Sequence, residues 1–179
     1  TDQELIEGCK RRSKMHEEYF FKKYYGFLMG IGRSYVKSED LAQEIVQDAF
    51  LKFFDSVGKL EQNPVILPWL RRIAVNTAID YYRKNQKFKL HEEADGNRLL
   101  VEQENAIEQL GYKEIIALLE QLPDDQQLIF NLYEVEGYSH KEIAEKLSIS
   151  ESSSRVYLTR AKHKLRQLIH LHYTVYAGR

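Results

Sequence analysis

The chain has 179 residues, 43% of them hydrophobic, and a formal net charge of −1 at pH 7. That length allows one core of ordinary size or two small ones, and the 12 tyrosines and 8 phenylalanines exclude a disordered tail. No run reaches the roughly 18 uncharged apolar residues of a membrane span, and the near-neutral charge excludes a protein coated in positive charge. We expect a folded, mostly helical protein without membrane insertion.

The single cysteine and the first residues bear on the cellular compartment. Cys9 has no second cysteine with which to form an internal disulfide, which suits a reducing cytoplasm. Its spacing from Leu5 and Ile6 predicts a core thiol. The first four residues, Thr-Asp-Gln-Glu, are polar and acidic, so no secretion signal is visible in the sequence. We expect a cytoplasmic protein.

The residue types that perform catalysis or bind metals are scattered. Even the closest histidines, His170 and His172, lie two apart on a predicted helix and do not share a face suited to one metal. No His-Glu-x-x-His motif, phosphate-binding glycine loop or cysteine cluster is present. We therefore predict that the chain is not an enzyme and has no catalytic residue, no metal and no cofactor.

Charge is distributed unevenly along the chain. Residues 38–55 hold five acids and one base, and residues 91–108 hold six acids and one base. Residues 69–90 hold six bases and one acid, and residues 150–169 hold five bases and one acid. Two basic segments embedded in a neutral chain favour local contact with nucleic acid over general binding to polyanions.

The first residues predict two helices. Thr1 and Glu4 form a capping box that opens a short helix. A second helix begins near Ser13 and runs to about Tyr35. Its many aromatic residues predict a stripe that packs against other helices.

The next segments predict one acidic and one basic helix. Ser38 can cap a helix that packs through residues at four-residue spacing and exposes an acidic face. Residues 56–68 contain two of the three prolines and predict a loop, after which a helix starts near Pro68 or Trp69 and ends near Lys84. The packing residues of the first helix are Leu41, Ile45, Ala49 and Phe53, and those of the second are Leu70, Ile73, Ala74, Thr77 and Ala78.

The last part of the chain predicts about four helices. The first spans Tyr112–Gln121, and the second starts at Pro123 and stops at Gly137. A short helix follows over His140–Leu147, and a longer one, capped by Ser150, runs to roughly His172.

No strand-like alternation competes with these helices, so the predicted fold is all-α, with two small helical bundles joined by a flexible linker. The linker is expected at residues 87–107, which are acidic and weakly periodic. It separates a first domain at 1–86 from a second domain at 108–179, which contains a helix-turn-helix.

The helix-turn-helix is predicted over residues 139–162. Ile143 and Leu147 point inward, Ala144 is small where two helices cross, and Ile149 fills the turn. Outward positions carry short polar or basic side chains that fit a major groove: Ser152, Ser153, Arg155, Val156, Thr159 and Lys162.

Serines mark three positions of this segment. Ser139 and Glu142 form a second capping box at the start of the motif. Ser148 stands where a turn often uses glycine, and Ser154 stands where many such motifs bury valine or isoleucine. Similar helix pairs also occur in proteins that never touch DNA.

Three segments in order resemble the extracytoplasmic-function (ECF) sigma factor family over nearly the whole chain. Residues 39–50, Glu-Asp-Leu-Ala-Gln-Glu-Ile-Val-Gln-Asp-Ala-Phe, resemble the helix that docks on a coiled coil of the RNA polymerase β′ subunit. Residues 69–84 resemble the helix for the minus-ten promoter element, and the helix-turn-helix resembles the reader of the minus-thirty-five element. The serine-rich start of the recognition helix is similar to variants from a Bacteroidetes-like branch.

This resemblance implies a factor that joins core RNA polymerase and directs promoter-specific initiation. Its implied partners are promoter DNA and core polymerase, through the β′ coiled coil and the β flap, and it leaves room for an anti-sigma factor. The residues implied for polymerase binding are Asp40, Leu41, Gln43, Glu44, Gln47 and Asp48. Those implied for the minus-ten element are Lys59, Asn63, Trp69, Arg71, Arg72, Asn76, Asp80, Arg83 and Lys84. Those implied for the minus-thirty-five element are Ser152, Ser153, Arg155, Val156, Thr159, Arg160 and Lys162.

Other interpretations remain open on the residues alone. Trp69 fits a core position as well as a stacked base, and an acidic helix face can simply be solvated. The alternative function is a helix-turn-helix transcriptional regulator that does not join polymerase. The acidic helix argues against it, because such a regulator has no need of Asp40, Gln43 and Glu44 on one exposed face.

Overall fold

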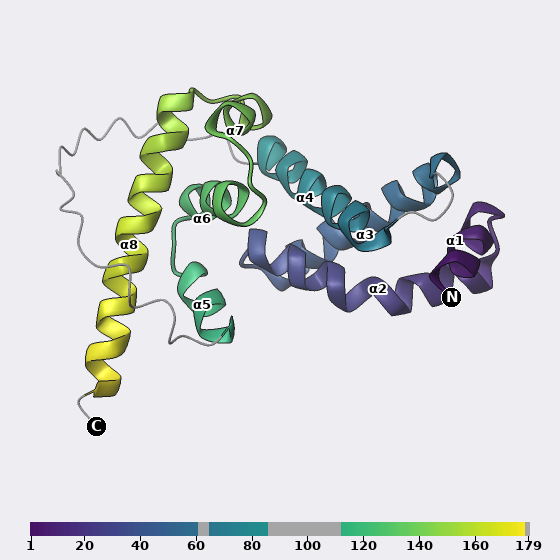
Figure 1. The fold of residues 1–179 in the computed structure, drawn as a ribbon, viewed down its shortest axis with the longest axis horizontal. Helices are drawn as coiled ribbons and strands as arrows, with labels where there is room; N and C mark the ends of the chain where they lie inside the picture. Colours follow the sequence, from purple (N-terminus) through teal and green to yellow (C-terminus); the bar gives the residue numbers. More distant parts are fainter. Residues whose placement is uncertain (61–64, 86–111, 178–179) are drawn as a thin grey trace. The chain divides into compact units, whose positions relative to one another are not determined.

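The computed structural model describes residues 1–60, 65–85 and 112–177. All regular secondary structure in these ranges is helical, which confirms the all-α fold class (Figure 1). The chain divides into two compact units, Thr1–Asn85 and Gln86–Arg179. The predicted linker, 87–107, lies outside the described residues.

The first unit is a bundle of three long helices with a short helix at one end (Figure 1). Helices α2, α3 and α4 pack against one another, while α1 packs on α2 and on the short 3-10 helix η1. The helices are α1 (Asp2–Lys10), α2 (Lys14–Tyr35), α3 (Glu39–Ser56), η1 (Val57–Lys59) and α4 (Ile66–Asn85).

Aromatic residues fill the core of this unit, as the stripe in the second predicted helix indicates. Phe20 of α2 stacks on Phe53 of α3, with ring centroids 4.1 Å apart and an interplanar angle of 14°. Glycine permits the close approach of the same two helices, because a Cβ at Gly32 would lie 3.1 Å from the carbonyl oxygen of Ala42. Cys9 is fully buried, and this burial raises the pKa of its thiol to about 11.

Local capping explains where two of these helices begin. Thr1 and Glu4 form the predicted capping box, and the Ser38 hydroxyl accepts a hydrogen bond from the Leu41 N–H. At its other end, α1 stops at Lys10, and Arg12, two residues later, adopts a left-handed φ of 56°. The Ser13 N–H then donates to the carbonyl of Gly8 at 3.1 Å, which satisfies one of the last carbonyls of the helix.

The predicted loop over 56–68 is shorter in the structure. Ser56 is the last residue of α3, η1 follows directly, and α4 begins at Ile66. Val57 and Ile66 are both buried, so apolar anchors extend helical structure into each side of the predicted loop. Pro68 lies in the first turn of α4, where its missing N–H has no intrahelical partner to lose.

Within residues 112–177, the second unit contains four α-helices and a π-helical turn. Its small core includes Leu119, Leu122 and Ala161, with Phe130 and Leu165 packed against them. The elements are α5 (Tyr112–Leu119), α6 (Asp124–Phe130), the π-helical turn (Asn131–Val135), α7 (His140–Leu147) and α8 (Glu151–Ala177).

The helix ends in this unit follow the predicted signals, with one exception. Gly137 ends the second helix with a φ of 75°, and the Tyr138 N–H donates to the carbonyl of Leu132 at 2.9 Å. Ser139 forms the predicted capping box with Glu142. The exception is α8, which continues five residues beyond His172 because no glycine or proline interrupts it before Ala177.

Within the described ranges, no helix is long and apolar enough to cross a membrane. The same residues contain no group of three or more His, Cys, Asp and Glu side chains arranged to hold a metal ion.

Candidate nucleic-acid interface

Three surfaces carry the residues singled out from the sequence: one on α3, one on α4, and one on α7 and α8. The first is the outward side of α3, called the α3 acidic face. Its exposed members are Asp40, Glu44, Gln47 and Asp48, while Leu41 and Gln43 are partly buried at its edges. The inward side of the helix is buried at Ala42, Ile45, Val46, Ala49, Phe50 and Phe53.

Most acids of this face are not neutralised by the protein itself. Asp40 and Asp48 form no ion pair with any residue that the structure describes. Glu39, by contrast, binds Arg33 with two hydrogen bonds, from Nε at 2.8 Å and Nη2 at 2.5 Å, and this contact lowers the pKa of Glu39. The acidic face therefore presents unbalanced negative charge to a partner.

Leu51 belongs to this face and was missed from the sequence. Its side chain is 62% exposed, three residues after Asp48 and four after Gln47. Helical spacing places it among the acids, and this spacing is the signal that could have identified it. This exposed leucine adds apolar area to the acidic face.

The second surface is a strip along α4, called the α4 face. Trp69, Arg72, Asn76, Asp80 and Arg83 follow one another at spacings of three and four residues and therefore share one side of the helix. None of them is fully buried, and Arg72 and Arg83 are exposed. Ile73, predicted to be a core residue, is only partly buried at the edge of this strip.

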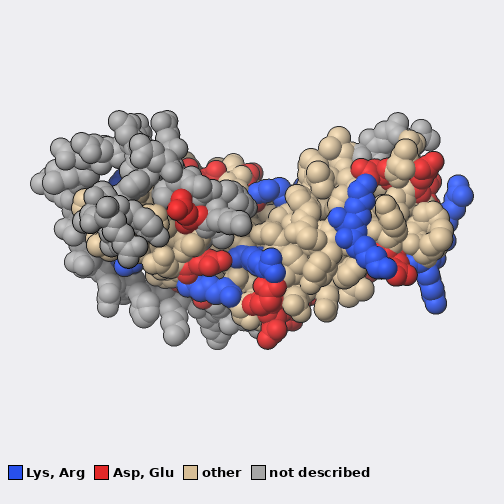
Figure 2. All heavy atoms as spheres, turned by 90° about the horizontal axis from the view of Figure 1, so that it is seen from below, with Lys and Arg blue, Asp and Glu red and all other residues tan. Residues whose placement is uncertain are grey.

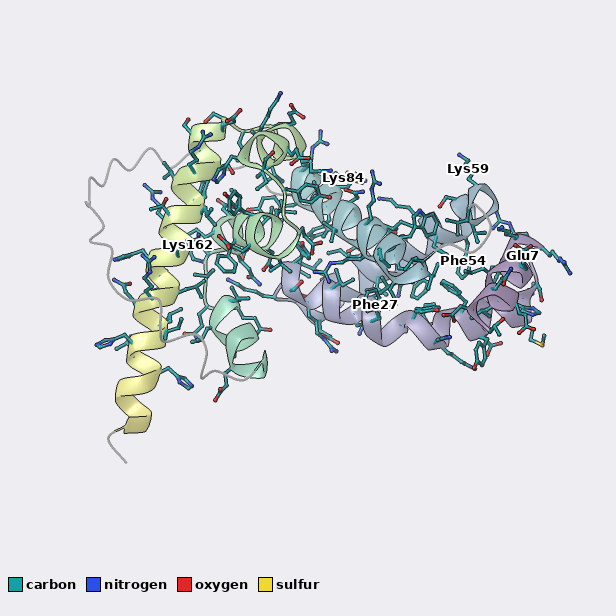
Figure 3. All side chains as sticks on the ribbon, viewed as in Figure 1. Glu7, Phe27, Phe54, Lys59, Lys84 and Lys162 are labelled. Atoms are coloured by element: carbon teal, nitrogen blue, oxygen red, sulfur yellow. The ribbon has the colours of Figure 1, made fainter. Side chains whose placement is uncertain are left out.

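Other residues expected near the minus-ten element lie off this strip. Arg71 falls outside the spacing and is partly buried, whereas Lys84 is exposed at the end of α4 (Figure 3). Lys59 is exposed on η1, and Asn63 lies outside the described residues.

Two members of the α4 face are also bound to α3. The Lys52 ammonium donates to Asp80 at 2.9 Å, so the acid in this basic helix is neutralised within the protein. Trp69 contacts Phe53 edge to face, with centroids 5.2 Å apart at 71°. Trp69 thus packs partly on the core while retaining an exposed side, which combines both interpretations of this residue.

The third surface is the helix-turn-helix of α7 and α8. Ser148 occupies the turn with a left-handed φ of 56°, and the Ile149 N–H donates to the carbonyl of Ala144 at 3.1 Å. Ile143 and Leu147 are buried, as predicted, and Ala144 is buried between them. The turn therefore has the expected geometry with serine in place of glycine.

A polar contact joins the two helices of this motif. Ser154 is fully buried, and its hydroxyl lies 2.9 Å from Nδ1 of His140. The His140 ring stacks on Tyr133, with centroids 4.5 Å apart. Burial lowers the pKa of His140, and the positive charges of Arg155 and Lys162 lower it further. A hydrogen bond thus replaces the apolar contact expected at Ser154.

The first turns of α8 present the predicted reading residues. Ser152, Arg155, Val156 and Thr159 are exposed, and Ser153, Arg160 and Lys162 are partly exposed. The Ser150 hydroxyl caps the helix by accepting the Ser153 N–H at 3.0 Å.

Two basic residues of this surface, Arg155 and Lys162, form ion pairs with acids that were not singled out from the sequence. Arg155 pairs with Glu151 at 2.9 Å, one turn earlier on α8. Lys162, labelled in Figure 3, pairs with Glu134 of the π-helical turn at 2.6 Å. The first pair follows the usual four-residue spacing, whereas the second joins residues 28 positions apart, for which the sequence gives no local signal.

Comparisons with known proteins agree with this arrangement. The model of sigma-70 region 2 matches residues 20–88, and that of sigma-70 region 4 matches residues 112–165. The chain is 27% identical to the RNA polymerase sigma-H factor of Pseudomonas aeruginosa over 176 residues, which cover 92% of this chain and 91% of that protein. It is 26% identical to the ECF RNA polymerase sigma factor SigM of Bacillus subtilis over 153 residues, which cover 84% of this chain and 91% of that protein.

A solved structure supports the fold. The structure of CnrH in complex with the cytosolic domain of CnrY matches with a TM-score of 0.50 at 19% identity, and the match covers 95% of this chain and 97% of that chain. Two sigma-70 regions in order, together with full-length ECF relatives, decide the family. The chain therefore belongs to the sigma-70 family, as an ECF sigma factor that directs promoter-specific transcription initiation.

Proposed function

We propose that this sigma factor divides its work among the three surfaces. The α3 acidic face binds core RNA polymerase. The α4 face and the segment between Ser56 and Pro68 hold the melted minus-ten element, and the first turns of α8 read the minus-thirty-five element. The chain then acts as a non-enzymatic subunit in the cytoplasm. The observation that carries the proposal is an acidic face whose exposed acids pair with no base in the described part of the chain, in the same protein as a helix-turn-helix.

The α3 acidic face has the properties of a site for a basic protein partner. Asp40 and Asp48 are exposed, so they can steer a positively charged surface into contact. Leu51 adds exposed apolar area at the end of this face that follows Asp48.

The α4 face suits a single DNA strand. Arg72, Arg83 and Lys84 supply exposed positive charge for the backbone. Trp69 has a partly exposed aromatic ring, and stacking on such a ring contributes about 1–3 kcal/mol per base. Because Lys52 neutralises Asp80, this carboxylate repels phosphates less than a free one would. Lys59 and Asn63 belong to the segment that we assign to a flipped base, a step that costs a few kcal/mol of unstacking.

The first turns of α8 suit the major groove of duplex DNA. Ser152 and Thr159 are short and exposed, so the helix backbone can approach the base edges closely. Arg155 can form a bidentate pair with guanine. To form this pair, Arg155 gives up its ion pair with Glu151. Lys162 likewise gives up its ion pair with Glu134 when it binds a phosphate.

The domain division belongs to this proposal. Residues 1–86 form the polymerase and minus-ten domain, residues 108–179 form the minus-thirty-five domain, and residues 87–107 connect them. Limited proteolysis of the free protein should yield two resistant fragments with cuts between residues 87 and 107. Rapid cleavage within either helical unit, with that segment protected, would place the boundary elsewhere.

Reconstitution with core polymerase tests the function as a whole. The purified chain and core enzyme should together produce run-off transcripts from a subset of a promoter library, and neither should do so alone. A regulator that does not join polymerase would bind DNA by itself and fail to co-purify with core enzyme. That outcome would overturn the assignment of the α3 acidic face.

A further inference from the structure

Basic side chains gather at a corner of the first unit that none of the three surfaces includes. Arg11 ends α1, Lys14 begins α2, and Lys59 ends η1, against which α1 packs. All three are exposed, and none forms an ion pair with a described residue. Figure 3 shows Lys59 projecting from η1 beside the end of the unit that carries Glu7. We call Arg11, Lys14 and Lys59 the basic corner.

Helix electrostatics explains only part of this cluster. Arg11 lies at the carboxyl end of α1, where the helix dipole favours a cation. Lys14 is the first residue of α2, where the dipole disfavours a cation, and the N-cap Ser13 makes no side-chain cap hydrogen bond there. The helix dipole therefore slightly disfavours the charge of Lys14, and an external anion beside it would offset that cost.

Two acids near the corner are already engaged, while Glu17, three residues after Lys14 on α2, forms no ion pair with a described residue. Glu7 accepts a hydrogen bond from Lys10 at 2.9 Å, and Asp55 pairs with Arg12 at 3.9 Å. Figure 2 shows acidic side chains beside the cationic ones at the end of the first unit. Among the described residues, the three bases of the corner therefore outnumber the acids left to balance them.

Lys59 connects the corner to the proposed DNA path. It belongs both to the corner and to the segment assigned to the minus-ten element, so a strand held there continues toward the α1–α2 turn. Resting on the proposed function, we infer that the basic corner binds backbone phosphates of the promoter strand next to the minus-ten element. Such a contact fixes the register of the strand and carries no sequence preference.

The test compares the salt dependence of promoter binding by reconstituted holoenzyme. The double variant Arg11→Gln/Lys14→Gln removes two charges, and Lys22→Gln is the matched control. Lys22 lies on α2, is exposed and pairs only locally, with Glu18 at 2.6 Å. Each lost phosphate contact lowers the slope of log affinity against log salt by about 0.7–0.9.

The double variant should therefore show a slope smaller by roughly 1.4–1.8, so that raising salt fourfold weakens the wild type about tenfold more than the variant. Lys22→Gln should keep the wild-type slope, and Lys59→Gln should lower it independently by about 0.7–0.9. With promoter fragments shortened stepwise from each end, the difference in salt slope between the wild type and the double variant should disappear once the DNA no longer reaches the corner.

The outcomes separate this inference from the function beneath it. Wild-type holoenzyme that does not bind promoter DNA would overturn the proposed function. Normal wild-type binding with an unchanged slope in the double variant would overturn the inference alone. Loss of core binding by the double variant would assign the corner to a protein partner and would also overturn the inference.

Discussion

The hydrogen bond between His140 and Ser154 should make a measurable contribution to the stability of the helix-turn-helix. Ser154→Ala removes a net contribution of about 0.5–1.5 kcal/mol and leaves the histidine nitrogen without its partner, a further penalty of about 1 kcal/mol for a partly buried group. We expect the free energy of unfolding of the second unit to fall by about 2 kcal/mol. The double variant His140→Phe/Ser154→Val replaces both partners with apolar groups and should lose much less.

The same contact predicts a pH dependence with a definite sign. The folded chain lowers the pKa of His140 from its ordinary value of 6.5, so it favours the neutral ring. As pH falls below 6.5, the unfolded chain takes up a proton before the folded chain does, and stability is lost. The contribution is fully present above pH 6.5 and disappears as pH drops through the folded pKa. It should be absent from the double variant.

Urea unfolding of the full chain, followed by far-UV circular dichroism between pH 5 and 8, measures both effects. Trp69 is the single tryptophan and lies in the first unit, so its fluorescence serves as an internal control. The His140 ring can be titrated directly by NMR. Wild-type stability in Ser154→Ala, combined with a His140 pKa of 6.5 in the folded chain, would refute the reasoning.

Four further variants test the assigned surfaces and the turn of the helix-turn-helix. Asp40→Lys/Glu44→Lys should abolish co-purification with core polymerase while leaving the melting temperature nearly unchanged, because exposed charges contribute little to stability; retained binding would contradict the α3 assignment. Arg155→Ala should cost about 1–3 kcal/mol of promoter binding and relax preference at one base pair, whereas Lys162→Ala should weaken all sequences alike and lower the salt slope by about one; a uniform loss from Arg155→Ala would reassign it to phosphate. Ser148→Gly should raise the unfolding free energy by about 0.5–1 kcal/mol, since glycine adopts the left-handed turn without strain; a lower melting temperature would show that the serine hydroxyl stabilises the turn.

Periodicity and capping signals predicted most of the fold. The second helix was expected from about Ser13 to Tyr35 and spans Lys14–Tyr35, because a continuous aromatic stripe and a polar N-cap define both ends. The helix α4 was expected to start near Pro68 or Trp69 but starts at Ile66. The prolines on either side predicted a loop there, and nothing in the sequence indicated that Ile66 is buried.

The sites were harder to predict where they depend on contacts between distant segments. The exposed positions of α3 and α8 follow from helical spacing and were predicted, apart from Leu51. Ion pairs such as Lys52 with Asp80 join residues that only the packing of helices brings together. The contact of Ser154 with His140 is another example. A serine where related motifs bury valine or isoleucine suggests a polar contact, but the sequence does not show which residue forms it.

The burial of Cys9 has a practical consequence for labelling the protein. Maleimides react with exposed thiolates, and this thiol is fully buried with its pKa raised to about 11. A cysteine introduced at an exposed position therefore reacts selectively without removal of the native one. Dyes attached through Lys22→Cys in the first unit and Lys141→Cys in the second would report the separation of the two units by energy transfer, in the free protein and after it joins the polymerase.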